Sequence, residues 1–401
     1  MSSCFAFLAP TKLLFGAGSL SRLGSEALPG TRALIVTTGG KSVKENGSLA
    51  RVEAELDRAG ASHVLFDRIE PNPLRETVNE GGWMARTEGC DFVVALGGGS
   101  VMDGCKAICT MAANPARAAD GSEAPGDIWD YMNGGTAKGL AIPNDPLPLV
   151  CIPTTAGTGS EVDAGGIVSC VETDEKLRLG DPRLFSRLSV VDPQIQLTVP
   201  QKLTAYQGFD AMFHNIECFI SKSSTPMGDM VCREGVRVAA SALPAAVADG
   251  FDLDARTKMA WASTMGGYAM CASGATGSHA IEHAMSAHHH SLPHGAGLIM
   301  ISRAYHGHMI ESHMCDDRYI QLARLMGHDG ATHPDDFLDE LVRLQEECGV
   351  AGLKMSDWGF DPVEFGAIAD NAMTTTKVLL DHDPVELTRD DIIDILEKSY
   401  R

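Results

Sequence analysis

The sequence is poor in positive charge. Its 401 residues include 32 Lys and Arg against 53 Asp and Glu, so the formal net charge is −21. This balance repels phosphate backbones and anionic membrane surfaces. We therefore expect neither nucleic acid nor a membrane as a partner.

Long apolar runs, closely paired cysteines and a basic N-terminal leader are also lacking. No stretch reaches the roughly 18 apolar residues of a membrane-spanning helix. The first residues, MSSCFAFLAPTKLLFG, lack the basic start and apolar core of a signal peptide. The 11 cysteines form no C-x-x-C motif, which is typical of reduced thiols that fill hydrophobic cores. We expect a cytoplasmic protein.

Two sequence textures divide the chain. In the first half, β-rich apolar runs at 33–37, 63–66, 92–96 and 149–152 are separated by helix-length segments such as 48–59 and 74–89. This alternation predicts βαβ units around a parallel sheet. In the second half helical periodicity dominates, as at 202–221, 227–247 and 335–347. We therefore predict an α/β domain over residues 1–195 and an all-α domain over residues 196–401.

Two glycine-rich turns follow predicted strands. Gly97, Gly98 and Gly99 precede Ser100 and a predicted helix. Glycine lets backbone N–H groups approach a ligand, and a helix N-terminus favours an anion, so this turn suits a pyrophosphate. A plain tight turn is the alternative, since the G-x-G-x-x-G fingerprint is absent. The second turn, at 153–161, offers threonine hydroxyls to a ligand, or is only a loop.

Histidines and one aspartate recur at helical spacing in the second half. Asp210 and His214 stand four residues apart, as do His279 and His283, and His294 follows in a Pro-His-Gly turn. Residues four apart lie on one face of a helix. One carboxylate with several imidazoles suits zinc or ferrous iron better than calcium or magnesium. The pattern predicts a transition-metal site. The histidine run at 288–290 is expected in a solvated loop, with an adventitious metal chelator as the alternative.

These stretches resemble the iron-containing (group III) alcohol dehydrogenases. The resemblance rests on Phe15-Gly16 with Gly18, Pro71-Asn72-Pro73, GGGSVMDGCKAI (97–108), PTTAGTGSEV (153–162), FDAMFHNIECFIS (209–221) and HAIEHAMSAHHHSLPHGAG (279–297). It implies a Rossmann-like dinucleotide-binding domain and a helical metal-binding domain that flank a cleft for coenzyme and metal. The interval from His279 to His294 is one residue longer than in many members of the family. The extra residue is expected in the 288–290 loop.

The resemblance also implies which residues form the site. The metal, Fe²⁺ with Zn²⁺ as a substitute, would be held by Asp210, His214, His279 and His294. The coenzyme-binding residues would be Gly39, Gly40, Ser42, Asn72, Gly97, Gly98, Gly99, Ser100, Asp103, Thr154, Thr155 and Thr158. His283, one helical turn beyond His279, would relay a proton as the catalytic residue, with a structural helix histidine as the alternative.

A metal of this kind polarises the oxygen of an alcohol or aldehyde, and a nicotinamide exchanges the hydride. We therefore expect an NAD(P)-linked dehydrogenase that interconverts a small primary alcohol or diol and its aldehyde. By resemblance, it would form a homodimer or a larger homo-oligomer. Two alternatives are a dehydroquinate-synthase-like cyclase, which would need a basic pocket, and a non-catalytic metal-binding protein, which would not need the glycine-rich turns.

The turn after the first predicted strand bears on the choice of coenzyme. Thr38-Gly39-Gly40-Lys41-Ser42 contains no carboxylate, and an acidic residue at this place would repel a 2′-phosphate. Lys41 or Lys44 can meet that phosphate instead. The turn also resembles the Gly-Gly-x-Ser turn of family members that accept NADP. The sequence thus favours NADP(H) over NAD(H).

Overall fold

The computed structural model describes residues 4–400; residues 1–3 and 401, at the outer ends of the two predicted domains, lie outside the described residues. The described residues form two compact units. The α/β unit contains residues 9–155 and 160–198, and the helical unit contains residues 4–8, 156–159 and 199–400. The main break thus follows residue 198, close to the predicted boundary at 195/196, but two short earlier segments pack with the helical unit.

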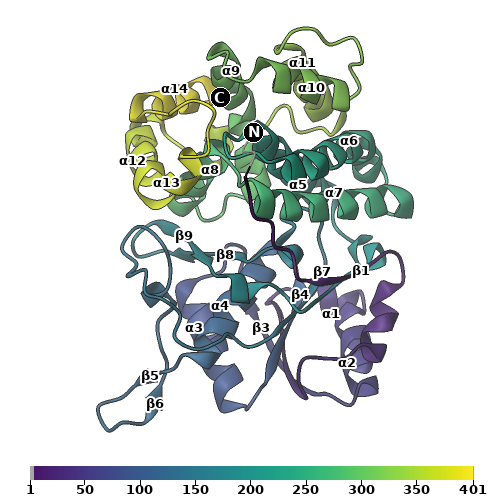
Figure 1. Cartoon of the computed structure of the whole chain (residues 1–401), viewed down its shortest axis with the longest axis vertical. Coiled ribbons are helices and arrows are strands. Elements are labelled where there is room, and N and C mark those ends of the chain that lie inside the picture. The colour runs from purple at the N-terminus through teal and green to yellow at the C-terminus, as the bar shows by residue number, and fades with distance from the viewer. Residues whose placement is uncertain (1–3, 401) are drawn as a thin grey trace. The chain divides into compact units, whose positions relative to one another are not determined.

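A parallel sheet of six strands forms the centre of the α/β unit (Figure 1). The strand order is β1-β10-β7-β4-β2-β3, and every neighbouring pair is parallel. The strands are β1 (Lys12–Phe15), β2 (Arg32–Thr38), β3 (Ser62–Ile69), β4 (Phe92–Gly97), β7 (Leu149–Pro153) and β10 (Leu188–Val191). The four predicted strands are confirmed as β2, β3, β4 and β7, whereas β1 and β10 were not predicted.

Successive side chains of each strand point to opposite faces of this sheet, and both faces are apolar. Helices therefore cover both faces. In β2, Leu34 and Val36 enter one hydrophobic core, and Ala33 and Ile35 enter the other. Each fully buried Leu, Val or Ile side chain contributes about 1.5–3 kcal/mol. The helices on the first core are α3 (Arg75–Thr87) and α4 (Gly99–Ala113), and those on the second are η1 (Ser19–Ser25), α1 (Ser42–Glu45) and α2 (Ser48–Arg58). The predicted Rossmann-like arrangement is confirmed.

Smaller elements extend the α/β unit. Two antiparallel hairpins pair β5 (Ala116–Arg117) with β6 (Glu123–Ala124) and β8 (Gly165–Cys170) with β9 (Glu175–Gly180). Four single 3-10 turns are η2 (Ile128–Asp130), η3 (Ser160–Val162), η4 (Pro182–Leu184) and η5 (Pro193–Gln196). None of these elements was predicted; β5, β6 and the four 3-10 turns are too short to show a clear periodicity.

The helical unit is built on helices that pack around one hydrophobic core. They are α5 (Gln201–Ile220), α6 (Pro226–Ala248), α7 (Leu253–Ala272), α8 (Gly277–His288), α9 (His294–Glu311), α10 (Asp316–Leu325), α11 (Asp336–Glu347), α12 (Phe365–Thr375), α13 (Lys377–Leu380) and α14 (Arg389–Ser399), with 3-10 turns η6 (Met355–Trp358) and η7 (Pro362–Glu364). The predicted all-α second half is confirmed.

Helix α5 lies inside the core of this unit. Every residue from Gly208 to Ile220 is buried, including Asp210, His214 and Glu217. Ionisable side chains are rarely buried without a partner or a ligand. The burial of these three side chains on α5 therefore indicates that they have partners or a ligand. Among the described residues, no helix is long and apolar enough to cross a membrane.

Candidate metal centre and coenzyme-binding edge

The predicted coenzyme-binding residues concentrate at one edge of the parallel sheet. Strand β2 lies between β3 and β4, so the chain moves from β2 to one side for β3 and returns to the other side for β4. In open α/β sheets, ligands bind at the carboxyl ends of strands beside such a reversal. Gly39 and Gly40 follow β2, and Gly98 follows β4. These residues thus share the edge at which such sheets bind ligands.

The turn between β4 and α4 depends on its glycines. A Cβ on Gly97 would collide with the Val101 side chain, and a Cβ on Gly98 would lie only 2.8 Å from Thr155 Oγ1. Gly98 is also the N-cap of α4 and has no side chain to bond the first N–H groups of the helix. Those groups point at the end of the helix, where an anion is stabilised.

Hydrogen bonds bring neighbouring turns together at this edge. Asn72 has a left-handed backbone, with φ of 56°, and its N–H donates to Ser100 Oγ over 3.2 Å. The Gly39 N–H donates to the Ile69 carbonyl at the end of β3 over 3.4 Å. The structure therefore places Asn72 beside Ser100, and Gly39 beside β3.

The turn after β2 has room for a larger group. A Cβ on Gly39 would have the Asp67 carbonyl, 3.5 Å away, as its nearest neighbour. Ser42 is exposed and begins α1, and Lys41 is exposed at its N-cap. Lys44 forms an ion pair with Asp67. Of the two lysines predicted to meet a 2′-phosphate, one thus already faces a carboxylate.

The second glycine-rich turn is divided between the two units. Thr154 and Thr155 belong to the α/β unit, where the Thr154 N–H donates to the Gly97 carbonyl over 3.0 Å. Thr158 lies in the segment 156–159 of the helical unit. In that segment Gly159 has a φ of 64°, and a Cβ on it would collide with the α7 backbone at Gly267. Only glycine fits where this segment meets α7.

Asp103 is engaged within the α/β unit. Its carboxylate accepts hydrogen bonds from Ser160 Oγ (2.6 Å) and from the Ile167 N–H (3.0 Å). The fully buried Lys106 donates to Ser160 and, over 2.6 Å, to Asp163. Burial raises the pKa of Asp103 to about 6, although the Lys106 charge acts in the opposite direction. We call Asp103, Lys106, Ser160 and Asp163 the Lys106 network. Contact between Asp103 and a coenzyme stays a prediction.

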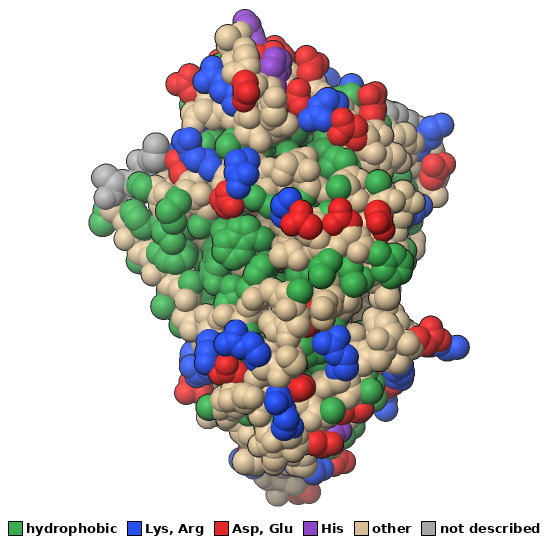
Figure 2. All heavy atoms as spheres, turned by 90° about the vertical axis from the view of Figure 1, so that its right-hand side faces the viewer, with side chains coloured by type: hydrophobic (Ala, Val, Ile, Leu, Met, Phe, Trp, Pro, Cys, Tyr) green, Lys and Arg blue, Asp and Glu red, His purple; other side chains and the backbone are tan. Residues whose placement is uncertain are grey.

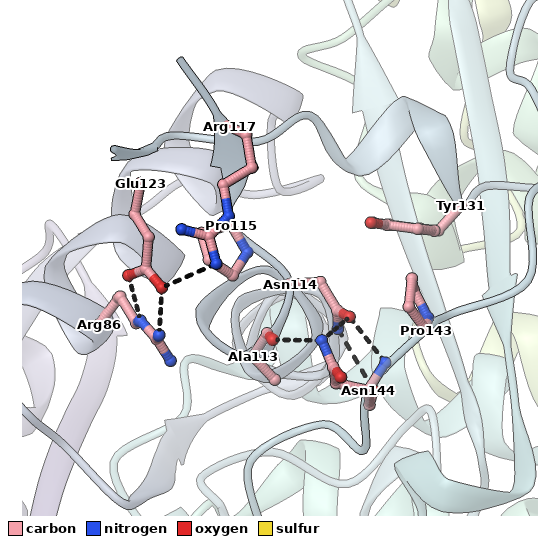
Figure 3. A pocket seen from close by; sticks show the side chains of 9 residues that line it. All are labelled: Arg86, Ala113, Asn114, Pro115, Arg117, Glu123, Tyr131, Pro143 and Asn144. Atoms are coloured by element: carbon pink, nitrogen blue, oxygen red, sulfur yellow. Dashed lines mark hydrogen bonds and ion pairs between the residues drawn. The ribbon is translucent and has the colours of Figure 1, made fainter. Parts of the chain in front are cut away.

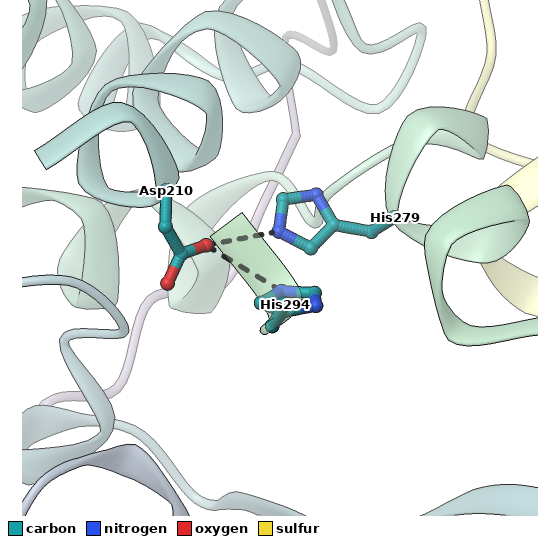
Figure 4. A group of neighbouring side chains, drawn as sticks. All are labelled: Asp210, His279 and His294. Carbon is teal, nitrogen blue, oxygen red and sulfur yellow. Dashed lines mark ion pairs between the residues drawn. The ribbon is translucent and has the colours of Figure 1, made fainter. Parts of the chain in front are cut away.

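The predicted metal ligands converge in the helical unit. Asp210 and His214 lie on α5, His279 lies on α8, and His294 is the first residue of α9. Asp210 Oδ1 lies 3.5 Å from His214 Nδ1, 3.5 Å from His279 Nε2 and 3.5 Å from His294 Nε2. Figure 4 shows Asp210 and two of these imidazoles pointing toward one another. We call these four residues the Asp210 cluster.

These distances suit ligands of one metal ion better than hydrogen bonds. Two atoms that each lie about 2.1 Å from a tetrahedral ion are about 3.4 Å apart, whereas a charged N–H···O bond spans about 2.7–2.9 Å. Asp210 Oδ1, His214 Nδ1 and His279 Nε2 are buried and make no hydrogen bond within the described part of the chain. Buried polar atoms without partners are costly, and a cation among them would satisfy all three.

The four residues are not equivalent. The ligand atoms of Asp210, His279 and His294 lie within 4.8 Å of one another. His214 is close to Asp210 and stacks on His279 with ring centroids 4.4 Å apart, but it does not belong to that closest group. Its place among the ligands stays a prediction.

Two buried glutamates are hydrogen-bonded to the Nδ1 atoms of two imidazoles in the Asp210 cluster. Glu217 Oε1 lies 2.8 Å from His279 Nδ1, and Glu282 Oε2 is hydrogen-bonded to His294 Nδ1. Both glutamates are completely buried. An ionised glutamate accepts the Nδ1 proton of each ring, which leaves the Nε2 lone pair for a metal.

Neither glutamate was predicted from the sequence. Glu217 stands seven residues after Asp210, and Glu282 stands three residues after His279. Both spacings place two residues on one face of a helix. The periodicity that marks the predicted ligands therefore also marks their supporting carboxylates.

The same contacts determine the ionisation of the Asp210 cluster. Burial opposes the ionisation of Asp210, but the surrounding imidazoles of His214, His294 and His279 favour the carboxylate more strongly, so the pKa of Asp210 is well below its usual value. Burial lowers the pKa of His214 to about 4. Burial also acts to lower the pKa of His279, but Glu217 and Asp210 raise it to about 10. A proton and a metal cation therefore compete for His279 Nε2.

His283 is buried at the side of the Asp210 cluster. Its ring centroid lies 5.5 Å from that of His294 and 6.3 Å from that of His279. Glu282, His283 and His294 also offer ligand atoms within 4.8 Å of one another. Because Glu282 is already bonded to His294 Nδ1, the group around Asp210 is the better metal site. The catalytic role of His283 stays a prediction.

The histidine run 288–290 is not a solvated loop, so that prediction is wrong. Helix α8 ends at His288, and all three histidines are half-buried. His289 Nε2 lies 3.0 Å from Glu364 Oε1, and its ring contacts Phe360 with centroids 3.9 Å apart. The run is covered because it follows α8 directly and packs against residues near η7.

A cavity of about 480 Å³ lies elsewhere in the α/β unit, beside the end of α4 (Figure 3). Arg86 pairs with Glu123 at its wall, and Asn114 bonds to Asn144. None of the predicted site residues lines this cavity. Its polar groups pair with one another, so it is a weaker candidate for the active site than the sheet edge and the Asp210 cluster.

Comparison with known proteins agrees with this geometry. Two family models match: "Iron-containing alcohol dehydrogenase" over residues 10–193 and "Fe-containing alcohol dehydrogenase family, C-terminal" over residues 204–400. The chain is 31% identical to a probable NADH-dependent butanol dehydrogenase 1 of Bacillus subtilis, over 98% of this chain and 99% of that protein. It is 30% identical to a 1,3-propanediol dehydrogenase of Citrobacter freundii, over 92% of each.

Solved structures give the same result. An archaeal halo-thermophilic alcohol dehydrogenase from a Red Sea brine pool has a TM-score of 0.93 at 30% identity, with both chains fully covered. A 1,3-propanediol oxidoreductase has a TM-score of 0.88 at 28% identity, over 99% of this chain and 100% of that one. These relatives are alcohol dehydrogenases and diol dehydrogenases, and this protein interconverts alcohols and aldehydes. The resemblance found in its motifs is confirmed: the chain belongs to the iron-containing alcohol dehydrogenase family.

Proposed function

We propose that the helical unit binds one divalent metal through Asp210, His214, His279 and His294. Ferrous iron is the proposed ion in the cell, with zinc as a substitute, since one carboxylate and three imidazoles suit both. One observation carries the proposal: Asp210 Oδ1 lies 3.5 Å from three ring nitrogens and accepts no hydrogen bond within the described residues. Glu217 and Glu282 support it, because they orient two of the rings.

In this proposal the chain's own residues bind and orient the reactants. When bound, the metal would supply a Lewis acid for the oxygen of the alcohol or aldehyde, and a nicotinamide would supply or accept the hydride. The burial of Asp210 and His279 keeps bulk water from competing at the site. His283, beside His294, would take up the hydroxyl proton during oxidation and return it during reduction.

The proposed coenzyme is NADP(H), with NAD(H) as the alternative. Gly97, Gly98, Gly99, Ser100, Asn72, Thr154, Thr155, Thr158 and Asp103 would serve the shared part of either coenzyme. Gly39, Gly40 and Ser42 would lie at the adenosine ribose, where the open turn accepts a 2′-phosphate and exposed Lys41 can meet it. The ion pair between Lys44 and Asp67 makes Lys41 the better partner for that phosphate.

The proposed substrates are small primary alcohols or diols and their aldehydes. The names of the relatives, a butanol dehydrogenase and a 1,3-propanediol dehydrogenase, support this class.

We also propose a cytoplasmic homo-oligomer. Exposed large hydrophobic side chains include Phe5, Leu8, Leu203 and Phe251, and Figure 2 shows hydrophobic side chains gathered on one face. Such a surface often marks a protein interface, which light scattering on the purified protein would test.

The test is a matrix of aldehydes, coenzymes and metals. Butanal, 3-hydroxypropanal and lactaldehyde would be reduced with NADPH or NADH by protein stripped with a chelator and reloaded with Fe²⁺ or Zn²⁺. We expect stripped protein to be inactive, Fe²⁺ to restore the highest rate, and NADPH to be preferred. Full activity of the stripped protein would overturn the metal proposal, and at least a tenfold preference for NADH would overturn the coenzyme proposal.

A further inference from the structure

A series of buried hydrogen bonds begins behind His279 and leads away from the Asp210 cluster. Glu217 Oε2 accepts bonds from the Thr276 N–H (2.9 Å) and from the Thr276 hydroxyl (3.0 Å). The Tyr305 hydroxyl lies 2.8 Å from Thr276 Oγ1 and also bonds to Asp383 Oδ1. Glu217, Thr276, Tyr305 and Asp383 are all completely buried. We call these four residues the Asp383 chain.

The number of hydrogens in this chain determines a protonation state. Three oxygen–oxygen contacts join Asp383 to Tyr305, Tyr305 to Thr276, and Thr276 to Glu217. The two hydroxyl groups supply only two hydrogens. Two buried oxygens at hydrogen-bond distance without a hydrogen between them repel each other. A third proton, on one of the two terminal carboxyl groups, therefore completes the chain.

The surroundings show which end carries that proton. Glu217 accepts bonds from the Thr276 N–H, the Thr276 hydroxyl and the His279 ring, and such bonds favour an ionised carboxylate. Asp383 accepts one backbone bond, from Gly277.

The second oxygen of Asp383 has an apolar setting. Asp383 Oδ2 has no hydrogen-bond partner among the described residues. A Cβ on Gly277 would collide with this oxygen and would contact Leu380 and Leu387. Burial also raises the pKa of Asp383 to about 7, although its hydrogen bonds to Tyr305 and Gly277 act to lower it. The proton therefore belongs on Asp383.

We propose that Asp383 is a positioning residue for the metal site, acting as a neutral carboxylic acid through Tyr305, Thr276 and Glu217. Its proton is donated to Tyr305, the Tyr305 proton to Thr276, and the Thr276 proton to Glu217. All bonds then run toward Glu217, which stays ionised and holds the Nδ1–H of His279. His279 Nε2 is thereby fixed toward Asp210. The inference rests on the metal site proposed above and extends it to α9 and to the loop before α14.

Four variants of the full-length protein separate this role from general packing. Tyr305→Phe interrupts the chain, and Asp383→Leu removes its terminal donor. Asp383→Asn keeps an N–H donor for Tyr305 without a charge, but its NH2 group cannot accept the Gly277 N–H as Asp383 Oδ1 does. Tyr319→Phe is the matched control, because Tyr319 is equally buried but its hydroxyl lies 3.0 Å from His306 Nδ1 and outside the Asp383 chain.

The measurements are the dissociation constant of Co²⁺, from chelator competition, and the visible absorption spectrum of the Co²⁺ protein. Loss of a group that orients a metal ligand typically weakens binding about 10–100-fold. We expect that loss, with a shifted spectrum, for Tyr305→Phe and Asp383→Leu. Tyr319→Phe should bind Co²⁺ within about threefold of the unmodified protein, because its hydroxyl lies outside the Asp383 chain. Asp383→Asn should lose less affinity than Asp383→Leu, because it keeps a donor for Tyr305.

Two results would overturn this inference and leave the proposed metal site unaffected. One is a Tyr305→Phe protein with the same Co²⁺ affinity and spectrum as Tyr319→Phe. The other is an Asp383→Asn protein that loses as much Co²⁺ affinity as Asp383→Leu. The comparison of these two Asp383 variants also tests the inference if Tyr305→Phe does not fold. If the unmodified protein does not bind one Co²⁺ per chain, the proposed metal site itself fails, and the inference fails with it.

Discussion

Each unit buries a group of charged side chains, and the two groups are satisfied differently. In the α/β unit, Lys106 Nζ donates to Ser160, to Asp163 and to the Gly165 carbonyl, while Asp103 accepts from Ser160. In the helical unit, Asp210 Oδ1 faces three imidazoles at 3.5 Å and accepts no hydrogen bond within the described residues.

This difference separates a network that satisfies its own charges from the proposed metal site. Opposite charges that are hydrogen-bonded to each other need no further partner, so the Lys106 network holds the loop after β7 in place. Lone pairs gathered around a carboxylate have no such balance and favour a cation. The lesson is that burial of charge alone does not mark a functional site, whereas unsatisfied ligand atoms do.

The largest expected effect comes from removing a ligand of the Asp210 cluster. His294→Ala should lose both the metal and the activity, because His294 supplies one of the three closest ligand atoms. Elemental analysis and aldehyde reduction would measure both losses. Thermal unfolding should match that of stripped unmodified protein. Full metal occupancy in this variant would show that the cluster is not the metal site.

His283→Ala should separate metal binding from catalysis in the helical unit. The variant keeps Asp210, His279 and His294, so it should retain metal, while turnover falls about 10²–10⁴-fold, as for other general acid–base groups. Metal content and the pH profile of kcat would be measured together. An unchanged kcat across the pH range would leave His283 a structural residue.

Lys106→Met tests the Lys106 network of the α/β unit. The substitution leaves Asp103 and Asp163 without their buried counter-charge, and breaking such a pair costs about 3–5 kcal/mol. We expect a lower melting temperature with the metal retained, whereas His294→Ala should lose the metal. A variant that melts like the unmodified protein would mean that the Lys106 network does not stabilise the α/β unit.

Gly39→Asp should alter the coenzyme preference with little effect on the metal. The position has room for a side chain, and a carboxylate beside the ribose would repel a 2′-phosphate. The ratio of kcat/KM for NADPH to that for NADH should fall at least about tenfold, or 1.4 kcal/mol. Gly39→Ala is the control, since it adds a Cβ without charge. Equal ratios in the two variants would contradict the proposed position of the phosphate.

The smallest expected effect is a pH dependence of stability within the Lys106 network. The fold raises the pKa of Asp103 from 3.8 to about 6, so the folded state holds this proton more tightly than the unfolded state. The resulting stability is complete below about pH 4 and is lost as the pH rises through about 6. The melting temperature of Asp103→Asn, relative to unmodified protein, should therefore rise by a few degrees over that range. A constant difference would contradict this linkage.

The sequence predicts those features whose signals are local. Strand β4, its glycines and the start of α4 are contiguous, so one stretch of sequence contains the whole turn. The spacing of Asp210 and His214 and that of His279 and His283 follow from the helix repeat alone. Motif resemblance then added the family, which the comparisons confirm.

Features that depend on distant pairing could not be predicted in this way. Strands β1 and β10 have four residues each and pair with each other across most of the first half of the chain. The Lys106 network joins α4 to a loop more than 50 residues later. The Asp383 chain needs α5, α9 and the loop before α14 to be packed together. No single stretch of sequence contains such a contact.

The Asp210 cluster also has a consequence for how much of the protein a cell would contain. Its ligands come from α5, α8 and α9, so one bound ion would join three helices of the core. A ligand at 100 times its dissociation constant adds about 2.7 kcal/mol to the stability of the folded state. Since marginally stable chains are removed by proteases, metal starvation would reduce the abundance of this enzyme as well as its rate.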